Sequence, residues 1–329
     1  MKARNQFVVI TSIFPPTRAV AQFAQIPGWR LIVAGDRKTP EAWNCPGAHF
    51  LSITEQDRSA YHLAKELPWN RYSRKMLGYL EAMRLGAELI ADTDDDNLPQ
   101  EHWCFPEMEN RYETMPADQG FVNIYRCFTS QHIWPRGFPL KRILDPAGLP
   151  HPEIPSTPVR VGIWQGLADG DPDVDAIYRL TSNAPCYFEQ RPPVVLERGT
   201  LCPFNSQNTL FRKEVFPLLY LPAFVPFRFT DILRSLVAQP ILWQHGYRLG
   251  FTSATVTQER NPHDYLADFE SEIPCYLWPE RVVDSVAAAV KIGRILGDNL
   301  TLAYAALVKE KIVPERELRV LEAWLRDLG

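Results

Sequence analysis

Short apolar runs alternate with helically spaced apolar positions through the first hundred residues of this chain. Four runs, among them FVVITSI and WRLIVA, have the apolar, often β-branched character that favours strands. These predicted strands cover residues 7–13, 29–34, 48–51 and 87–91. Pro15 and Pro16 end the first strand, and Thr17 is suited to cap a following helix. Residues 71–85 carry apolar positions at helical spacing before Gly86, which predicts a helix with a glycine C-cap.

This order of elements, with short links between them, predicts an α/β fold whose mostly parallel, doubly wound sheet is flanked by helices. The middle of the chain differs because seven prolines fall between residues 134 and 162. Proline disfavours helices and central strands, so we expect an ordered, irregular loop at 134–160 that borders the functional site. Residues 231–246 and 282–325 are again helical in pattern, with a break expected at 297–299.

Composition narrows the class of protein. Of the 329 residues, 46% are hydrophobic and 22% are charged, which is typical of a globular protein. A net charge of −4 gives no support for binding to nucleic acid or to anionic membranes. The six cysteines are scattered without a CxxC pair, which suits a reducing cytosol. The N-terminal apolar run is too short for a signal sequence or a membrane span, and no later segment reaches membrane length.

Four aspartates crowd the end of the predicted strand at 87–91, in the sequence AELIADTDDDN. Open α/β sheets bind ligands at the carboxyl ends of their strands, and hard cations such as Mg²⁺ or Mn²⁺ favour carboxylate oxygens. Asp94 and Asp96 have the spacing of a metal-facing pair, with Asp95 directed toward a ribose or sugar. Asp92 is expected to face the interior or a basic neighbour. A solvated acidic turn is the alternative interpretation.

Two further segments carry candidate chemistry. Asp231, in FRFTDILRS, is a candidate general base, and Thr230 or Asp231 can instead be a helix N-cap. In the turn QERNPHD, Arg260 is a candidate for phosphate binding. His263 in the same turn can complete a metal shell or contact phosphate, or simply be exposed. Basic residues near predicted strand ends could face a base or a diphosphate, although most surface cations do neither; they are Arg18, Lys38, Arg74, Lys75 and Arg136.

No P-loop, GxGxxG, GxSxG or HExxH motif is present, which argues against P-loop ATPases, dinucleotide-binding proteins and the common hydrolases and zinc proteases. Several longer segments instead resemble the STELLO family of probable glycosyltransferases. They run from near the N-terminus to about residue 270 and include FVVITSIFPPTRAV, RYSRKMLGYLEAMRLGAELIADTDDDN, GLADGDPDVDAIYRLT and FTDILRSLVAQPILWQHGYRLGF. The acidic triplet and the TDI segment are also faintly similar to the reversibly glycosylated polypeptides, the UDP-arabinopyranose mutases.

The STELLO resemblance implies a glycosyltransferase-A fold, a nucleotide-sugar donor such as a UDP-sugar, and Mn²⁺ or Mg²⁺ at the aspartates. In that fold, the matching positions place Asp94, Asp95 and Asp96 in a DXD-type motif. Thr11 and Ser12 then contact the nucleotide, and Asp36 the base or ribose. Asp231 falls where inverting enzymes carry their base, and Arg18, Lys75 and Arg260 remain candidates for donor contacts.

The resemblance also sets the expected domain organisation. Residues 1–275 form the catalytic domain, with a nucleotide-binding half at 1–100 and an acceptor half at 101–275, and residues 276–329 form a helical appendage. The expected activity is transfer of a sugar to a hydroxyl acceptor of a glycan, in contact with other glycan-synthesis proteins. A sugar-nucleotide mutase, a nucleotidyltransferase and a non-catalytic scaffold are alternatives. Without the plant members' anchor, a cytoplasmic location or a peripheral one at the inner membrane is expected.

Overall fold

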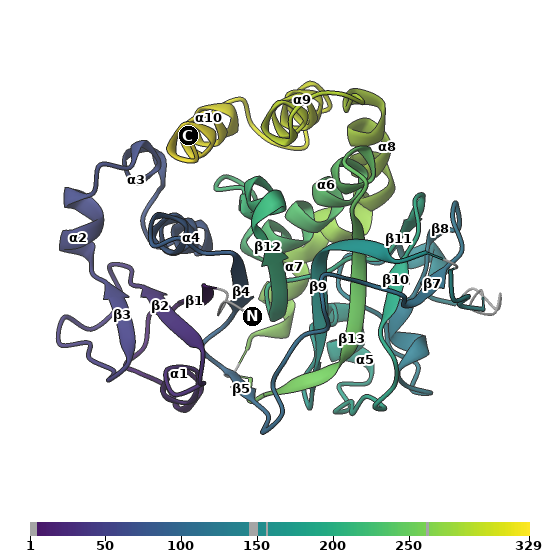
Figure 1. Ribbon diagram of the computed structural model, residues 1–329, viewed down its shortest axis with the longest axis horizontal. Coiled ribbons are helices and arrows are strands. Elements are labelled where there is room, and N and C mark those ends of the chain that lie inside the picture. Colours follow the sequence, from purple (N-terminus) through teal and green to yellow (C-terminus); the bar gives the residue numbers. More distant parts are fainter. Residues whose placement is uncertain (1–4, 145–150, 156, 261–262) are drawn as a thin grey trace.

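A large mixed sheet forms the centre of the computed structural model, which describes residues 5–144, 151–155, 157–260 and 263–329 (Figure 1). Its first four strands lie in the order β3-β2-β1-β4, and all three pairings are parallel. They are β1 (Gln6–Thr11), β2 (Trp29–Ala34), β3 (Ala48–Leu51) and β4 (Leu89–Thr93). The prediction of a parallel α/β arrangement is therefore confirmed for this part of the chain.

Beyond β4 the sheet mixes directions. β12 (Asn208–Arg212) runs antiparallel to both β4 and β9 (Val159–Asp169), whereas β13 (Arg248–Gln258) runs parallel to β9. The sheet continues through β10 (Val194–Leu196) to β7 (Glu113–Met115). The short strands β5 (Asn97–Pro99) and β6 (Glu109–Asn110) pair with β13 and β9, and β8 (Gly120–Phe121) pairs with β11 (Thr200–Leu201).

Helices lie on both faces of the sheet (Figure 1). Thr17 caps the first helix as predicted, since its side chain accepts from the N–H of Val20. In the predicted helix before β4, a 3₁₀ turn precedes an α-helix, and Gly86 follows with a φ of +84°. The helices of the first 200 residues are α1 (Arg18–Phe23), α2 (Ile53–Arg58), α3 (His62–Glu66), η1 (Tyr72–Arg74), α4 (Lys75–Arg84), η2 (Ile124–Cys127), η3 (Leu140–Arg142) and α5 (Ala176–Thr181).

The C-terminal part is largely helical, as predicted. Figure 1 shows its last three helices arching over α6 and reaching α3. The expected break at 297–299 is wrong, because these residues form the first turn of α9 and the chain leaves helical structure at 290–295 instead. The elements are η4 (Lys213–Leu219), η5 (Phe227–Phe229), α6 (Thr230–Gln244), α7 (Tyr265–Leu277), α8 (Pro279–Ala289), α9 (Leu296–Lys309) and α10 (Glu317–Asp327).

Side chains on opposite faces of the sheet pack into two hydrophobic clusters. In β1, Phe7 and Val9 join the larger cluster, whereas Val8 and Ile10 join the smaller one, as alternation along a strand requires. The larger cluster also contains Tyr304 of α9 and Trp324 of α10, so the C-terminal helices share a core with the sheet. The boundary at residue 275 stays a prediction.

This architecture is a mixed α/β fold with a helical C-terminal region, and it is compatible with the expected glycosyltransferase-A-like class. In the described part of the chain, no helix combines the length and apolar character that a membrane crossing requires. The proline-rich loop begins with buried residues at 133–139, but its positions 145–150 and 156 lie outside the described residues.

Candidate active site

A cleft of about 420 Å³ opens where β1, β2 and β4 end. One wall comes from the ends of these strands and from the segment before α4. The opposite wall comes from separate segments around Arg136, Asp173, Gln207, Arg228 and Arg260. The cleft thus lies at the carboxyl edge of the parallel strands, where the sequence pattern placed it. The predicted site residues that line it are Thr11, Ser12, Asp36, Asp94, Asp95, Asp96, Asp231, Arg260 and His263.

Asp92 lies beneath the cleft and is fully buried. Its carboxylate is 2.6 Å from Lys75 Nζ and 2.8 Å from Arg234. Burial alone would raise the pKa of Asp92, but these two cations outweigh it and hold the pKa below its usual value. Asp92 therefore faces the interior and basic neighbours, as its position in the strand indicated.

The next three aspartates differ in their partners. Asp94 accepts a hydrogen bond of 2.5 Å from the Tyr72 hydroxyl and lies 3.0 Å from Lys75 Nζ. Asp95 accepts a hydrogen bond from the Ser12 hydroxyl. Asp96 accepts from Gln258 Nε2 at 3.0 Å through one oxygen. The other oxygen, Oδ1 of Asp96, is buried and has no hydrogen-bond partner among the described residues.

Burial raises the pKa of all three carboxyl groups. For Asp96 the pKa rises to about 6, because burial is reinforced by the charge of Asp94. The pKa of Asp94 is raised by burial although Lys75 opposes the effect, and that of Asp95 is raised by burial although Ser12 opposes it. The cluster is therefore electrostatically unfavourable by itself, and a bound cation would stabilise it.

The carboxylates of this cluster can coordinate a divalent cation only together with oxygen atoms of a bound ligand. Within the described residues, no three His, Cys, Asp or Glu side chains are arranged to hold a metal ion by themselves. Asp94 and the unpartnered oxygen of Asp96 can supply carboxylate ligands, and a bound diphosphate and water would have to supply the others. His263 lies at the cleft, and its Nδ1 is 2.9 Å from Asp268 Oδ2.

On the nucleotide side, Asp36 is a buried hydrogen-bond acceptor. It accepts from the backbone N–H groups of Arg37, Asn70 and Arg71 at 2.7 to 3.2 Å, and so fixes the loop that leads to Tyr72. Lys38 and Arg71 also line the cleft, and neither forms an ion pair with any described residue. These two side chains are exposed cations that can meet a negatively charged ligand.

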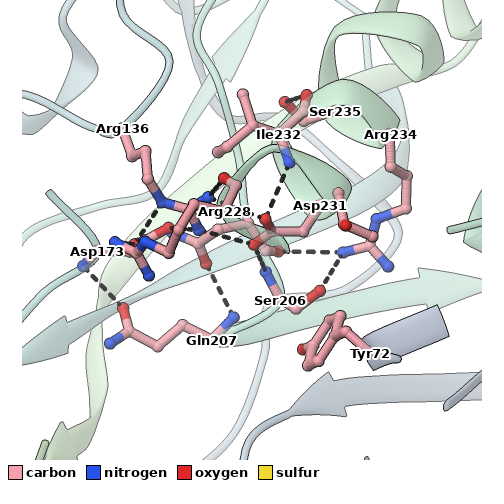
Figure 2. A network of polar contacts seen from close by, with 12 residues as sticks. Tyr72, Arg136, Asp173, Ser206, Gln207, Arg228, Asp231, Ile232, Arg234 and Ser235 are labelled. Carbon is pink, nitrogen blue, oxygen red and sulfur yellow. Dashed lines mark hydrogen bonds and ion pairs between the residues drawn. The ribbon is translucent and has the colours of Figure 1, made fainter. Parts of the chain in front are cut away.

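On the opposite wall, Asp231 is held in a network of polar contacts (Figure 2). Both of its oxygens accept from the Arg136 guanidinium at 3.1 Å. They also accept from the N–H groups of Ser206 and Ile232 at 3.2 and 3.0 Å. Asp231 is the second residue of α6, whose N-cap is Phe229, so neither Thr230 nor Asp231 takes the N-cap position that the sequence suggested.

Asp173 supports the same network from a loop after β9. It binds Arg136 through bonds of 2.9 and 2.6 Å and lies 3.6 Å from Arg228. Burial opposes its ionisation, but these guanidinium groups outweigh burial and lower its pKa to about 2. Arg260 pairs with Asp171 at 2.5 Å, so the guanidinium groups of this wall are matched by carboxylates.

Three predicted basic residues do not line the cleft. Arg18 is exposed, pairs with Glu259 at 3.5 Å and borders a separate hollow beside α1. Lys75 is fully buried, and its ammonium group binds Asp92, Asp94 and the Thr93 carbonyl. Arg74 is buried against Gln56 and the Trp69 ring. Arg136 lines the cleft, but both of its terminal nitrogens already contact carboxylates.

Sequence reasoning missed several cleft residues. Tyr72 precedes Lys75 by one helical turn, a spacing that could have indicated its hydrogen bond from Lys75, although not its contact with Asp94. Asp173 lies in the acidic stretch GLADGDPDVDA, which contributed to the resemblance without being assigned a role. No local signal distinguishes Gln207, Arg228 or Gln258, because only the packing of distant segments brings them to the cleft.

The family model and the sequence relatives that match this chain carry the same family name. The family model of the STELLO glycosyltransferases matches residues 228–329. Probable glycosyltransferase STELLO2 of Arabidopsis thaliana is 29% identical over 98% of the chain, and STELLO1 of the same plant is 28% identical over 98%. The chain spans 44% of the length of each of these relatives.

Among solved structures, the crystal structure of a mycobacterial protein overlaps 95% of the chain and 76% of its own length. The TM-score of this overlap is 0.37, and the two sequences are 11% identical. The sequence relatives and the family model confirm the resemblance that the motifs predicted. The chain is similar to the two STELLO proteins over nearly its whole length, and its C-terminal part matches the STELLO family model.

Proposed function

We propose that this protein is a metal-dependent glycosyltransferase that moves a sugar from a nucleotide-sugar donor to a hydroxyl acceptor in glycan synthesis. A UDP-sugar is the first donor to test. One observation carries the proposal: Asp94, Asp95 and Asp96 meet in one cleft, with raised pKa values and an unpartnered oxygen on Asp96. Such a cluster is costly in the free protein, and a cation with its diphosphate would relieve that cost.

The residues of the nucleotide side have distinct roles in this proposal. Asp94 and Asp96 would hold the cation, and Asp95, fixed by Ser12, would face the ribose or sugar. When bound, the cation stabilises the negative charge of the departing diphosphate. Lys38 and Arg71 add positive charge at the same wall. Tyr72 and Lys75 hold Asp94 from behind, which limits its movement when the ligand binds.

Asp231 is the proposed general base for the acceptor hydroxyl. In the free protein both of its oxygens accept hydrogen bonds, so Asp231 must release a bond to Arg136 before it can take a proton. Arg136 would keep its two bonds to Asp173 during that change. The guanidinium therefore has a second anchor, and freeing one Asp231 oxygen does not require Arg136 to leave the wall.

A thermal-shift panel of nucleotides and nucleotide sugars, each with Mn²⁺ and with EDTA, tests the donor site. A ligand that binds only the native state raises the melting temperature. We expect a Mn²⁺-dependent shift with one nucleoside diphosphate, absent in Asp94→Ala and Asp96→Ala. No shift with any nucleotide would contradict the proposal and favour a non-catalytic scaffold.

Turnover tests the role of Asp231 separately. We expect Asp231→Asn to keep the Mn²⁺-dependent donor shift and to lose sugar transfer, since an amide cannot accept the proton. A full transfer rate in this variant would show that Asp231 is not the base. Product analysis also identifies the reaction, because a transferase releases free nucleoside diphosphate whereas a mutase yields an isomeric nucleotide sugar.

A further inference from the structure

The acceptor wall of the cleft has a charge pattern unlike that of the donor wall. Its three guanidinium groups are each paired: Arg136 with Asp173 and Asp231, Arg228 with Glu272 at 2.9 Å, and Arg260 with Asp171 at 2.5 Å. Lys38, after β2, and Arg71, before α4, lie on the donor wall and form no ion pair within the described part of the chain. A phosphate or carboxylate on the acceptor would therefore meet no free cation among the described residues of the acceptor wall.

Matched guanidinium and carboxylate groups suit neutral hydroxyl groups instead. A hydroxyl donates one hydrogen bond and accepts others, so it can bind between a carboxylate and a guanidinium or amide. Gln207 and Gln258 add such amides to the same wall and are hydrogen-bonded to each other. The wall thus offers donors and acceptors side by side, and its three guanidinium groups face four carboxylates, so the named residues carry no net positive charge that would attract an anion.

One apolar side chain interrupts this polar wall. Phe227 lines the cleft and is 54% exposed, although the residues after it, Arg228 and Phe229, are 8% and 0% exposed. The exposure does not come from a loose segment: the N–H of Arg228 donates to Ser271 at 3.2 Å, and the Phe229 ring packs against Trp278. The fold therefore holds an aromatic ring open to solvent beside Asp231.

The Phe227 ring also reaches the donor wall. It makes an edge-to-face contact with Tyr72, with ring centroids 5.7 Å apart, and the Tyr72 hydroxyl binds Asp94. The exposed ring is therefore connected through Tyr72 to the proposed cation ligand, and it lines the same cleft as the proposed base. A group that packs on this ring would lie in the cleft that the proposed cation ligands and the proposed base also line, where an acceptor has to bind.

From these observations we infer that the acceptor is a neutral sugar, whose ring packs on Phe227 while its hydroxyls bind the paired side chains of the acceptor wall. The apolar face of a sugar ring is suited to an aromatic surface. This inference rests on the proposed function and specifies its acceptor as a neutral glycan, in preference to a peptide hydroxyl, an acidic sugar or a phosphorylated lipid.

The test compares neutral and acidic acceptors of the same shape. The full chain with Mn²⁺ and its donor is given methyl glucoside, methyl galactoside, methyl xyloside and the matching disaccharides as neutral acceptors. Methyl glucuronide and a serine peptide are tested separately as alternative acceptors. Nucleoside diphosphate released above the rate without acceptor measures transfer. We expect transfer to at least one neutral glycoside and much less to the glucuronide and the peptide.

Substitutions at Phe227 test whether the acceptor sugar packs on this ring. Phe227→Ala is expected to raise the acceptor KM about tenfold, as loss of one aromatic contact predicts, while the donor dissociation constant stays unchanged. Phe227→Trp should preserve the acceptor KM. Tyr187, which is 66% exposed and does not line the cleft, provides the matched control, and Tyr187→Ala should change neither constant.

A binding measurement keeps this inference separate from the proposed reaction. Saturation-transfer NMR follows the same methyl glycosides without donor, in the wild type and in Phe227→Ala. Glycoside binding that depends on Phe227 supports the neutral-sugar site even if no donor binds, in which case only the proposed function fails. Preference for the glucuronide or the peptide, or an unchanged glycoside signal and KM in Phe227→Ala, would overturn the inference.

Discussion

Among single residues, Asp96 is where function and stability oppose each other most directly. Its pKa is about 6 in the native state and about 3.9 in an unfolded chain. Between these values the native state binds more protons, so the free energy of unfolding falls as pH rises through this window and stays lower above it. We expect Asp96→Asn to stabilise the free protein at pH 7.5 by on the order of 2 kcal/mol.

Urea denaturation from pH 4 to pH 7.5 checks this prediction. The decline of unfolding free energy with pH should be smaller in Asp96→Asn than in the wild type, and Mn²⁺-dependent nucleotide binding should be lost. Asp284→Asn, on an exposed position of α8, is the control and should match the wild type. Equal pH dependence in Asp96→Asn and the wild type would show that the pKa of Asp96 is not raised in the native state.

Lys75 illustrates a second prediction at this scale, because it serves the fold and not the donor directly. Lys75→Met would leave Asp92 fully buried, with Arg234 as its remaining cationic partner among the described residues. Removing one partner of a buried ion pair typically costs about 3–5 kcal/mol, so we expect a loss of that order in urea denaturation. Adding Asp92→Asn should recover part of it. Unchanged stability with lost donor affinity would instead indicate a direct donor contact.

The sequence predicted individual aspartates better than individual cations. Asp92 and Asp94 lie two positions apart, which places them on the same side of an extended strand, and both contact Lys75. They differ because Asp92 lies within β4, whereas Asp94 follows the end of that strand at the cleft. Lys75, Arg74 and Arg136 look alike in sequence, and what separates them is which carboxylate or carbonyl each meets after packing. A long basic side chain reaches partners from several elements, so its role is decided by tertiary structure.

Among elements, those of the first hundred residues could be predicted and those of the second half only in part. β2 and β3 begin and end where the apolar runs do, because each run is short and bounded by turn residues. The pairing of β12 between β4 and β9 has no such local signal, since these strands are far apart in sequence. The acceptor wall depends on that pairing, which is why Asp173 and Gln207 were missed.

The contact between α10 and α3 supports a prediction at this scale. Asp327 ends α10, and its carboxylate accepts from the N–H groups of His62 and Leu63 at 2.9 and 2.8 Å, the start of α3. The side chain is only 4% exposed. We expect Asp327→Ala to lower the free energy of unfolding by about 1–2 kcal/mol, as loss of a helix cap does.

Chemical denaturation measures this effect against Glu322→Ala, a substitution at an exposed position of the same helix. The control should stay within about 0.5 kcal/mol of the wild type. If the two variants were equally stable, Asp327 would not act as a cap between the helices. Asp327→Asn should fall between them, because an amide oxygen can accept one of the two backbone bonds.

For the whole molecule, the question is whether the C-terminal helices are an appendage or part of the folding unit. Glu317, at the start of α10, is buried and accepts from the Tyr220 hydroxyl and from the N–H groups of Ala223 and Phe224. That segment leads into η5 and α6, which carry Phe227 and Asp231. The C-terminal helices thus support the acceptor wall from outside the cleft.

We therefore expect that a chain lacking residues 279–329 does not fold cooperatively, because Val282, Tyr304 and Trp324 belong to the shared core. Near-ultraviolet circular dichroism and urea unfolding test this: the full chain should unfold in one transition, and the shortened chain in none. Trp324→Ala provides a milder test, with an expected loss of about 3–5 kcal/mol from a fully buried side chain. A shortened chain that unfolds cooperatively and still binds nucleotide with Mn²⁺ would restore the boundary at residue 275.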